Sequence, residues 1–198
     1  MMIGVDLDNT LICYDALFHR LGREMGDLPS NIPIDKTAIR NWFRANGQED
    51  IWTQMQAHAY GDRILGAQAF LGAVDTLLGW QLAGHHVAIV SHKTRTPYSG
   101  PMFDLHSAAR KWLEVAGLSG VPAYLEETRS GKIDRIARLQ CTAFIDDLPE
   151  FLFDPLFPDV PTRILFDPNG NFPSKHNSGI IQARSWSDVR DQIEQSRN

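Results

Sequence analysis

Two carboxylates follow the first apolar run of the chain. Met2 to Val5 predict a short buried strand, and Asp6 and Asp8 come directly after it. Residues i and i+2 of an extended chain project to the same side, so two like charges would lie together at the tip of this strand. That placement is costly unless a cation or a reaction requires it. The pattern therefore indicates a site with a carboxylate nucleophile, a second carboxyl group for proton transfer, and a hard metal ion that neutralises both.

Strand and helix signals alternate through the C-terminal part of the chain. Short apolar runs predict strands at residues 87–90, 121–125, 143–145, 163–166 and 180–183. Alternation of this kind favours parallel βαβ units with right-handed crossovers, and the continuous apolar runs fit strands covered on both faces. We therefore expect an α/β fold, a three-layer Rossmann-like parallel sheet flanked by helices.

The helices between these strands have recognisable ends. Asp104 is expected to cap a helix that stops at Gly117. Ser130 and Gly131 are expected to precede a helix that Lys132 opens. Ser185 has the spacing of a capping box with Asp188 before a C-terminal helix.

Polar residues follow the predicted strands in a consistent way. Asp6 and Asp8 follow the first strand, Ser91 follows the run at 87–90, and Asp146 and Asp147 follow the run at 143–145. Ligands of open parallel sheets bind outside the carboxyl ends of the strands. We therefore expect these five residues to meet at one edge of the sheet.

Residues 13 to about 85 carry helix signals and no convincing strand. We predict a small helical domain at 13–79, inserted between the two parts of an α/β core at 1–12 and 80–198. The last helix of this region carries an apolar stripe that suits a crossover helix of the core: Phe70, Leu71, Val74, Leu77 and Leu78. Aromatic and apolar residues of the insert could line a pocket, but their helical spacing favours a packed core: Trp42, Phe43, Trp52, Met55 and Tyr60.

Composition excludes several classes of protein. The 198 residues carry a formal net charge of −5, and no basic run follows a nucleic-acid backbone, so we expect no nucleic-acid partner. No apolar segment is long enough to span a bilayer, and the N-terminus has no signal-peptide pattern. Cys13 and Cys141 have no zinc-site spacing, so we expect reduced thiols in a cytoplasmic protein.

The order of these residues resembles the haloacid dehalogenase (HAD) superfamily of phosphohydrolases. Its four motifs would be Asp6-Leu7-Asp8-Asn9-Thr10, then Ser91, then Lys132, then Asp146-Asp147. The resemblance extends from residue 2 to about residue 190. It implies a helical cap inserted after the first motif, which matches the predicted insert.

The resemblance also implies a role for each residue. Asp6 would attack phosphorus, and Asp8 would protonate the leaving oxygen and later deprotonate water, with its proton affinity raised by negative neighbours. Ser91 would bind a phosphate oxygen, and Lys132 would neutralise the phosphoryl group together with Asp6. Mg²⁺ would bind Asp6, the backbone carbonyl of Asp8 and Asp146, while Asp147 would hold a metal-bound water or orient Lys132.

The leading hypothesis is a Mg²⁺-dependent phosphatase of a small phosphorylated metabolite, such as a sugar phosphate or a nucleotide. An acid at Asp8 points to phosphoryl transfer, because dehalogenases of the superfamily do not need one there. A phosphomutase and a non-catalytic binding or regulatory protein remain as alternatives, while the acidic charge counts against a nucleic-acid end-processing phosphatase. Neither the physiological substrate nor the oligomeric state follows from the sequence.

Two other cations compete with Lys132 for the phosphate. Arg129 lies near the start of the predicted helix, and Lys93 is two residues past Ser91. The segment from Ser91 to Arg95 is rich in hydrogen-bond donors. It could bind a second phosphate or a carboxylate of the substrate, or it could be a solvated loop.

Overall fold

A six-stranded parallel sheet forms the centre of the protein. The computed structural model describes residues 1–173 and 179–196. The strand order is β5-β4-β1-β6-β7-β8, and every neighbouring pair is parallel. The strands are β1 (Met2–Val5), β4 (His86–His92), β5 (Ala123–Glu126), β6 (Ala143–Asp146), β7 (Thr162–Phe166) and β8 (Ile180–Ala183). The predicted α/β architecture is confirmed.

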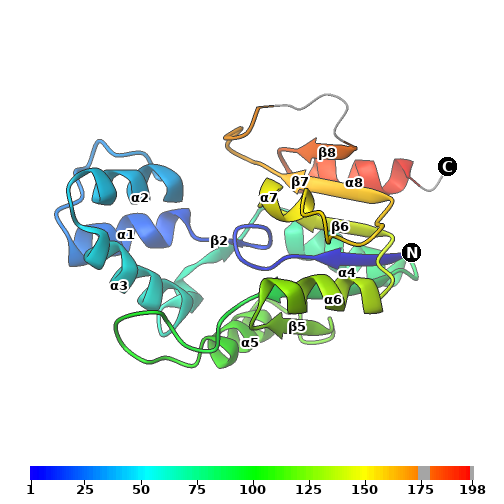
Figure 1. Ribbon diagram of the computed structural model, residues 1–198, viewed down its shortest axis with the longest axis horizontal. Helices are drawn as coiled ribbons and strands as arrows, with labels where there is room; N and C mark the ends of the chain where they lie inside the picture. Colours follow the sequence, from blue (N-terminus) through cyan, green and yellow to red (C-terminus); the bar gives the residue numbers. More distant parts are fainter. Residues whose placement is uncertain (174–178, 197–198) are drawn as a thin grey trace.

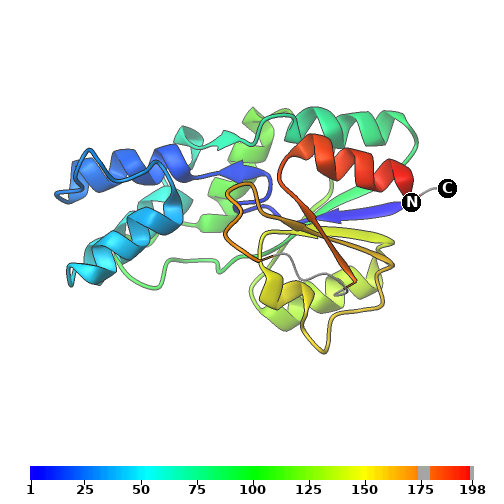
Figure 2. The ribbon, with the colours of Figure 1, turned by 90° about the horizontal axis from the view of Figure 1, so that it is seen from above.

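Helices cover both faces of this sheet, as Figure 2 shows. Core residues of α4 (Ala73–Leu82), α5 (Leu105–Val115) and α8 (Trp186–Gln195) join one apolar cluster. Residues of α6 (Arg129–Arg138) and α7 (Pro149–Leu152) join a second cluster. Along β4, Val87 and Ile89 belong to the first cluster and Ala88 and Val90 to the second, as the two-residue period of a strand requires. Both faces are apolar, which explains the continuous apolar runs of the sequence.

Three helices and a short strand pair lie between β1 and α4. Figure 1 shows α1 (Asp15–Met25), α2 (Lys36–Ala45) and α3 (Glu49–Tyr60) together at one end of the molecule. A 3₁₀ turn, Ile64–Gly66, follows α3. Phe43, Trp52 and Met55 are fully buried, so the interpretation of these three residues as packed core is correct, whereas Trp42 and Tyr60 are only partly buried.

The expectation of no strand in this region is wrong. Residues Ile12–Cys13 (β2) pair antiparallel with Gln68–Ala69 (β3) where the chain leaves the core and returns to it. The amide of Phe70 extends the pair by donating to the carbonyl of Leu11 at 2.9 Å. Two residues per strand are too few to produce a periodic pattern, so pairing here depends on contacts between distant segments.

Two predicted helix starts are also corrected. Helix α4 begins at Ala73 after Gly72, whose φ is 80°, so Leu71 is outside the apolar stripe and 97 % exposed. Helix α6 begins at Arg129 after Thr128, whose hydroxyl caps it, so Ser130 and Gly131 lie inside its first turn.

Other predicted helix ends agree with the structure. Asp104 caps α5, and Ser185 forms a capping box with Asp188 at α8.

In residues 1–173 and 179–196, no helix combines the length and apolar composition needed to cross a bilayer.

Gly4 allows the side chain of Phe144, from β6, to pack directly against β1. A Cβ atom at Gly4 would lie 2.5 Å from Cδ2 of Phe144 and 3.0 Å from Sγ of Cys141. Phe144 is fully buried and has little room to move. Only a glycine therefore fits this position of β1, two residues before Asp6.

Replacement of Gly4 by alanine is expected to lower the free energy of unfolding by about 1–3 kcal/mol, because the new methyl group overpacks the core. Gly79→Ala is the matched control: Gly79 is on the exposed side of α4, where a Cβ meets nothing within 4 Å. There alanine is expected to stabilise by up to about 1 kcal/mol through its helix propensity. Urea unfolding of both variants tests this, and equal effects would contradict it.

Candidate active site

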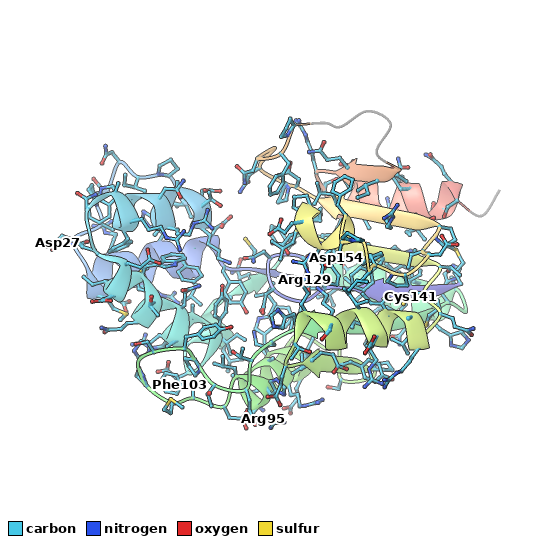
Figure 3. All side chains as sticks on the ribbon, in the orientation of Figure 1. Asp27, Arg95, Phe103, Arg129, Cys141 and Asp154 are labelled. Atoms are coloured by element: carbon cyan, nitrogen blue, oxygen red, sulfur yellow. The ribbon has the colours of Figure 1, made fainter. Side chains whose placement is uncertain are left out.

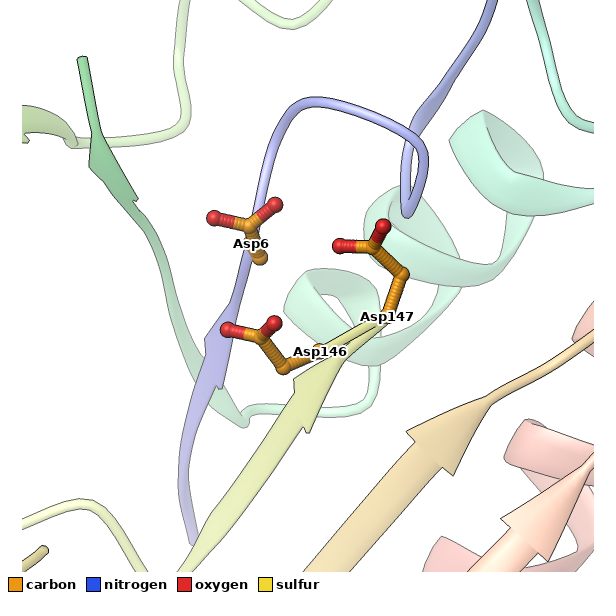
Figure 4. Close-up of side chains that lie close together, drawn as sticks. All are labelled: Asp6, Asp146 and Asp147. Carbon is orange, nitrogen blue, oxygen red and sulfur yellow. The ribbon is translucent and has the colours of Figure 1, made fainter. Parts of the chain in front are cut away.

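Three carboxylates converge at the carboxyl edge of β1 and β6, as Figure 4 shows. The parallel register pairs Val5 with Ile145, and the amide of Asp6 donates to the carbonyl of Ile145 at 2.9 Å. Asp6 and Asp146 therefore lie side by side, and Asp147 follows directly. One carboxylate oxygen from each of the three residues lies within 4.8 Å of the others. The meeting of these residues at one edge is as predicted.

Lys132 enters this cluster from α6. Its Nζ donates to Oδ1 of Asp6 at 2.7 Å and to Oδ2 of Asp146 at 2.5 Å, and the residue is 2 % exposed. The ammonium also lies 4.2 Å from the ring centre of Phe151. Burial would lower the pKa of Lys132, but the Asp146 and Asp6 carboxylates raise it above its usual value, so Lys132 stays charged.

The cluster brings three carboxyl groups to one ammonium group. Burial, together with the Asp146 carboxylate, raises the pKa of Asp6 to about 7 against the opposing effect of Lys132. Burial and the carboxylates of Asp146 and Asp6 raise the pKa of Asp147 well above its usual value. Three carboxylate groups around one ammonium favour a further cation, and oxygen ligands of this kind suit a hard ion such as Mg²⁺. The residues present fit such an ion.

Asp8 lies apart from this cluster and has partners of its own. The hydroxyl of Tyr14 donates to Oδ1 of Asp8 at 2.6 Å, and Nζ of Lys93 donates to Oδ2 at 2.6 Å. Although burial raises the pKa of Asp8, the Lys93 ammonium and these hydrogen bonds outweigh it and hold the pKa below its usual value. The expectation of a raised proton affinity is wrong for the protein without substrate, because Lys93 offsets the negative neighbours.

The loop between β1 and β2 holds Asp8 in position. Asn9 has a left-handed φ of 63°, and its amide donates to the carbonyl of Ile12 at 2.9 Å, which closes the loop. Nε1 of Trp186, from α8, donates to the carbonyl of Thr10 at 3.0 Å. A turn within the loop and a helix from the other end of the chain thus fix the same short segment.

Ser91 is placed at the same edge as Asp6. It is 1 % exposed near the end of β4, where the register pairs it with Leu125. Its binding of a phosphate oxygen and the ligation of a metal by the backbone carbonyl of Asp8 stay predictions.

The competing cations have different surroundings. Nη2 of Arg129 pairs with Oδ2 of Asp154 at 2.7 Å, at the start of α6 (Figure 3). Lys93 is 4 % exposed, contacts Asp8 and lies 4.9 Å from the ring centre of Tyr60. Lys93 therefore belongs to the edge of the sheet that carries Asp8, and Lys132 is the cation of the carboxylate cluster.

Two residues of this edge, Tyr14 and Lys36, were not identified from the sequence. A third, Tyr60, was named there only as a residue that could line a pocket or belong to a packed core. Tyr14 precedes α1, Lys36 begins α2 and Tyr60 ends α3. Nζ of Lys36 donates to Oδ1 of Asn9 at 3.0 Å and lies 5.6 Å from the ring centre of Tyr60. These helix ends face Asp8 because the three helices pack on one another, and no local sequence pattern reports that packing.

Replacement of Lys132 by methionine is expected to lower the free energy of unfolding by about 3 kcal/mol, because it leaves buried carboxylates without their cation. Lys111→Met is the matched control, since Lys111 pairs with Glu114 at 2.9 Å on the exposed side of α5. Its stability should change little. Urea unfolding in metal-free buffer makes the comparison, and equal stabilities of the two variants would show that the buried pairs have no such role.

Comparison with known proteins gives structural matches only. No protein-family model and no curated protein matches the sequence. Among solved structures, the magnesium-bound HAD-hydrolase YfnB from Bacillus subtilis matches with a TM-score of 0.60 and 13 % identity, over 100 % of this chain and 98 % of that one. A HAD family hydrolase from Deinococcus radiodurans, with bound phosphate and sodium, matches with a TM-score of 0.58 and 13 % identity, over 99 % and 96 %.

A dehalogenase also matches, with a TM-score of 0.58 and 14 % identity over 95 % of this chain and 94 % of that one. At these identities the likeness shows a shared fold. The fold is the one that the four motifs predict, and it extends over nearly the full length of each chain compared.

Proposed function

We propose that this chain, which has the fold of the haloacid dehalogenase-like hydrolases, is a Mg²⁺-dependent phosphatase of small phosphorylated metabolites such as sugar phosphates or nucleotides. The observation that carries this proposal is that Asp6 and Asp8, two residues apart in the chain, have different partners. Asp6 lies in a cluster with Asp146, Asp147 and Lys132, and Asp8 lies beside it with Lys93 and Tyr14. Two acids in different surroundings can take different roles in one reaction.

Asp6 is the nucleophile of this proposal. A phosphate monoester resists attack because it is already anionic, so catalysis needs positive charge and positioning. The Asp6 carboxylate attacks phosphorus and forms an aspartyl-phosphate, which water then hydrolyses. Lys132 holds Oδ1 of Asp6 and stays protonated, so it can stabilise the phosphoryl oxygens as they approach. Ser91 donates its hydroxyl to one of these oxygens.

The carboxylates of Asp6, Asp146 and Asp147 would hold Mg²⁺. When bound, this ion supplies positive charge to the phosphoryl oxygens and offsets repulsion between the carboxylates. The magnesium of the Bacillus subtilis hydrolase and the phosphate of the Deinococcus radiodurans hydrolase support the choice of ion and substrate class. The raised pKa of Asp6 fits a site that is completed by a cation.

Asp8 moves the protons of both steps. The Lys93 ammonium and the Tyr14 hydroxyl lower its pKa before substrate binds. The anionic phosphoryl group raises that pKa, so Asp8 takes up a proton from solvent and then gives this proton to the leaving oxygen. It then accepts a proton from the attacking water. A dehalogenase would have no use for this second acid, so the Lys93–Asp8–Tyr14 contacts favour phosphoryl transfer.

Two alternatives differ in the fate of the phosphoryl group. A phosphomutase would transfer it from Asp6 to a substrate hydroxyl, with helices α1 to α3 as a cap that excludes water. A binding or regulatory protein would not need the complete set of Asp6, Asp8 and Lys132, all of which are in place. Release of inorganic phosphate separates the phosphatase from both alternatives.

Purified protein with Mg²⁺ is expected to release phosphate from at least one member of a panel of sugar phosphates, nucleotides and p-nitrophenyl phosphate. Chelation of the metal and the Asp6→Asn substitution should each abolish release, because one removes the cation and the other removes the nucleophile. Asp191→Asn, an exposed change in α8, is the matched control and should retain activity. Release that survives in Asp6→Asn would contradict the mechanism.

Asp8→Asn is expected to slow formation of the aspartyl-phosphate only for esters whose leaving oxygen needs a proton. It should slow hydrolysis of the aspartyl-phosphate for every ester, because the attacking water then lacks its base. Hydrolysis of an alkyl phosphate should fall by about a hundredfold or more, since its alkoxide needs a proton. p-Nitrophenolate needs none, so p-nitrophenyl phosphate should give a burst of one nitrophenolate per enzyme followed by slow turnover. Rapid mixing measures the burst. An equal loss for both esters without a burst would refute a proton-transfer role for Asp8.

A further inference from the structure

A cavity beside Asp8 marks the place of the leaving group. In the proposed phosphatase the acid that protonates the leaving oxygen must contact it. Asp8 lines a cavity of about 220 Å³, together with residues of α3 and of the loop that follows β4. The part of the substrate beyond the leaving oxygen therefore enters this cavity.

The buried charges of this cavity are already paired with each other. Nζ of Lys93, which is 4 % exposed, donates to Oδ2 of Asp8 at 2.6 Å. The lining also includes His92, which is exposed to solvent, where water and salt screen a charge. An anionic group on the leaving group would lose water, lie beside the Asp8 carboxylate and find Lys93 already engaged. The cavity therefore favours an uncharged leaving group.

One face of α3 forms a wall of the cavity. Four lining residues have the i, i+3, i+4, i+7 spacing of a single helix face: Thr53, Gln56, Ala57 and Tyr60. The Thr53 hydroxyl donates to the carbonyl of Glu49 at 2.9 Å. The side-chain amide of Gln56 is partly buried and has no hydrogen-bond partner within residues 1–173 and 179–196. Gln56 therefore presents unused polar atoms on the cavity-facing side of α3.

A carboxamide in this position can recognise hydroxyl groups. It has two N–H donors and one oxygen acceptor, so it can both donate to a hydroxyl and accept from one. A partly buried amide that no protein group satisfies gains from a ligand that supplies these bonds. The apolar side chains of Ala57, Pro97 and Leu105 also line the cavity and suit the carbon skeleton of such a ligand.

The volume of the cavity limits the size of the leaving group. Pockets for drug-sized ligands usually span about 300–1,000 Å³, whereas this cavity has about 220 Å³. A nucleoside is a ligand of drug size, and a polyol or a simple sugar is smaller. The cavity therefore fits the smaller class.

We propose that the substrate is a phosphate ester of an uncharged polyol or simple sugar, and that Gln56 hydrogen-bonds a hydroxyl group of this leaving group. This inference rests on the proposed phosphatase function and narrows its substrates. Gln56 determines specificity from the inserted helices, while Asp6 and Asp8 carry out the chemistry.

Three matched pairs of esters test the proposal. Glycerol 3-phosphate has two hydroxyl groups that propyl phosphate lacks. 3-Phosphoglycerate has a carboxylate in place of the hydroxymethyl group of glycerol 3-phosphate, and uridine 5′-monophosphate has a base that ribose 5-phosphate lacks. The wild-type kcat/KM should be at least about fivefold higher for glycerol 3-phosphate than for propyl phosphate, the size expected of one neutral hydrogen bond. It should also be higher for the uncharged or smaller leaving group of the other two pairs.

Gln56→Leu should bring the ratio of glycerol 3-phosphate to propyl phosphate to within about twofold of one, through a higher KM for glycerol 3-phosphate. Gln54→Leu is the matched control, because Gln54 is an exposed residue of the same helix, and it should leave the ratio unchanged. Circular dichroism and the thermal midpoint check that each variant is folded.

Several results would overturn the inference while leaving the phosphatase in place. They are a wild-type ratio near one for the first pair, a ratio that persists in Gln56→Leu, or a preference for 3-phosphoglycerate or uridine 5′-monophosphate within its pair. Hydrolysis of p-nitrophenyl phosphate without hydrolysis of glycerol 3-phosphate or ribose 5-phosphate would have the same meaning. Absence of metal-dependent release from every ester would refute the phosphatase and the inference together.

Discussion

The burial of the Lys132 ammonium between two carboxylates is the interaction on which the edge of the sheet depends. Asp6 follows β1, Asp146 ends β6, and Lys132 comes from α6, so three elements meet at one set of charges. None of these groups could be buried alone at an acceptable cost in free energy. Their mutual contacts permit burial. The adjacent Asp147 adds a third carboxyl group, whose pKa is raised by burial and by the other two carboxylates, so a bound cation would stabilise its ionised form.

The order of the strands explains why chemistry gathers here. From β1 the chain builds outward through β4 and β5, then returns to place β6 on the other side of β1. The crevice where a parallel sheet reverses its strand order opens at the carboxyl ends, and β1 and β6 border it. Gly4 lets Phe144 pack against β1 just below the site, so the same two strands supply both the charged edge and the core beneath it.

The helices inserted after β1 supply the other side of the edge. Tyr14, Lys36 and Tyr60 lie at the ends of α1, α2 and α3, and each contacts a residue of the core edge or its cation. The sheet provides the carboxylates that react and bind a metal in the proposed function. In the same proposed function, the insert and Lys93 border the space that the leaving group enters beside Asp8. This division separates the chemistry of the phosphoryl group from the choice of substrate.

From the sequence alone we could predict the sheet, most helix ends and the meeting of Asp6, Ser91 and Asp146. Continuous apolar runs, capping residues and parallel connections are local or topological signals that one sequence carries. The sequence also indicated Lys132, through its place in the order of motifs. Only the tertiary structure decided the surroundings of Asp8 and the pairing of β2 with β3. The low pKa of Asp8 arises from Lys93, 85 residues away, and from Tyr14 at a helix end. Such contacts depend on how three short helices pack against a sheet, and no pattern within a single segment carries that information.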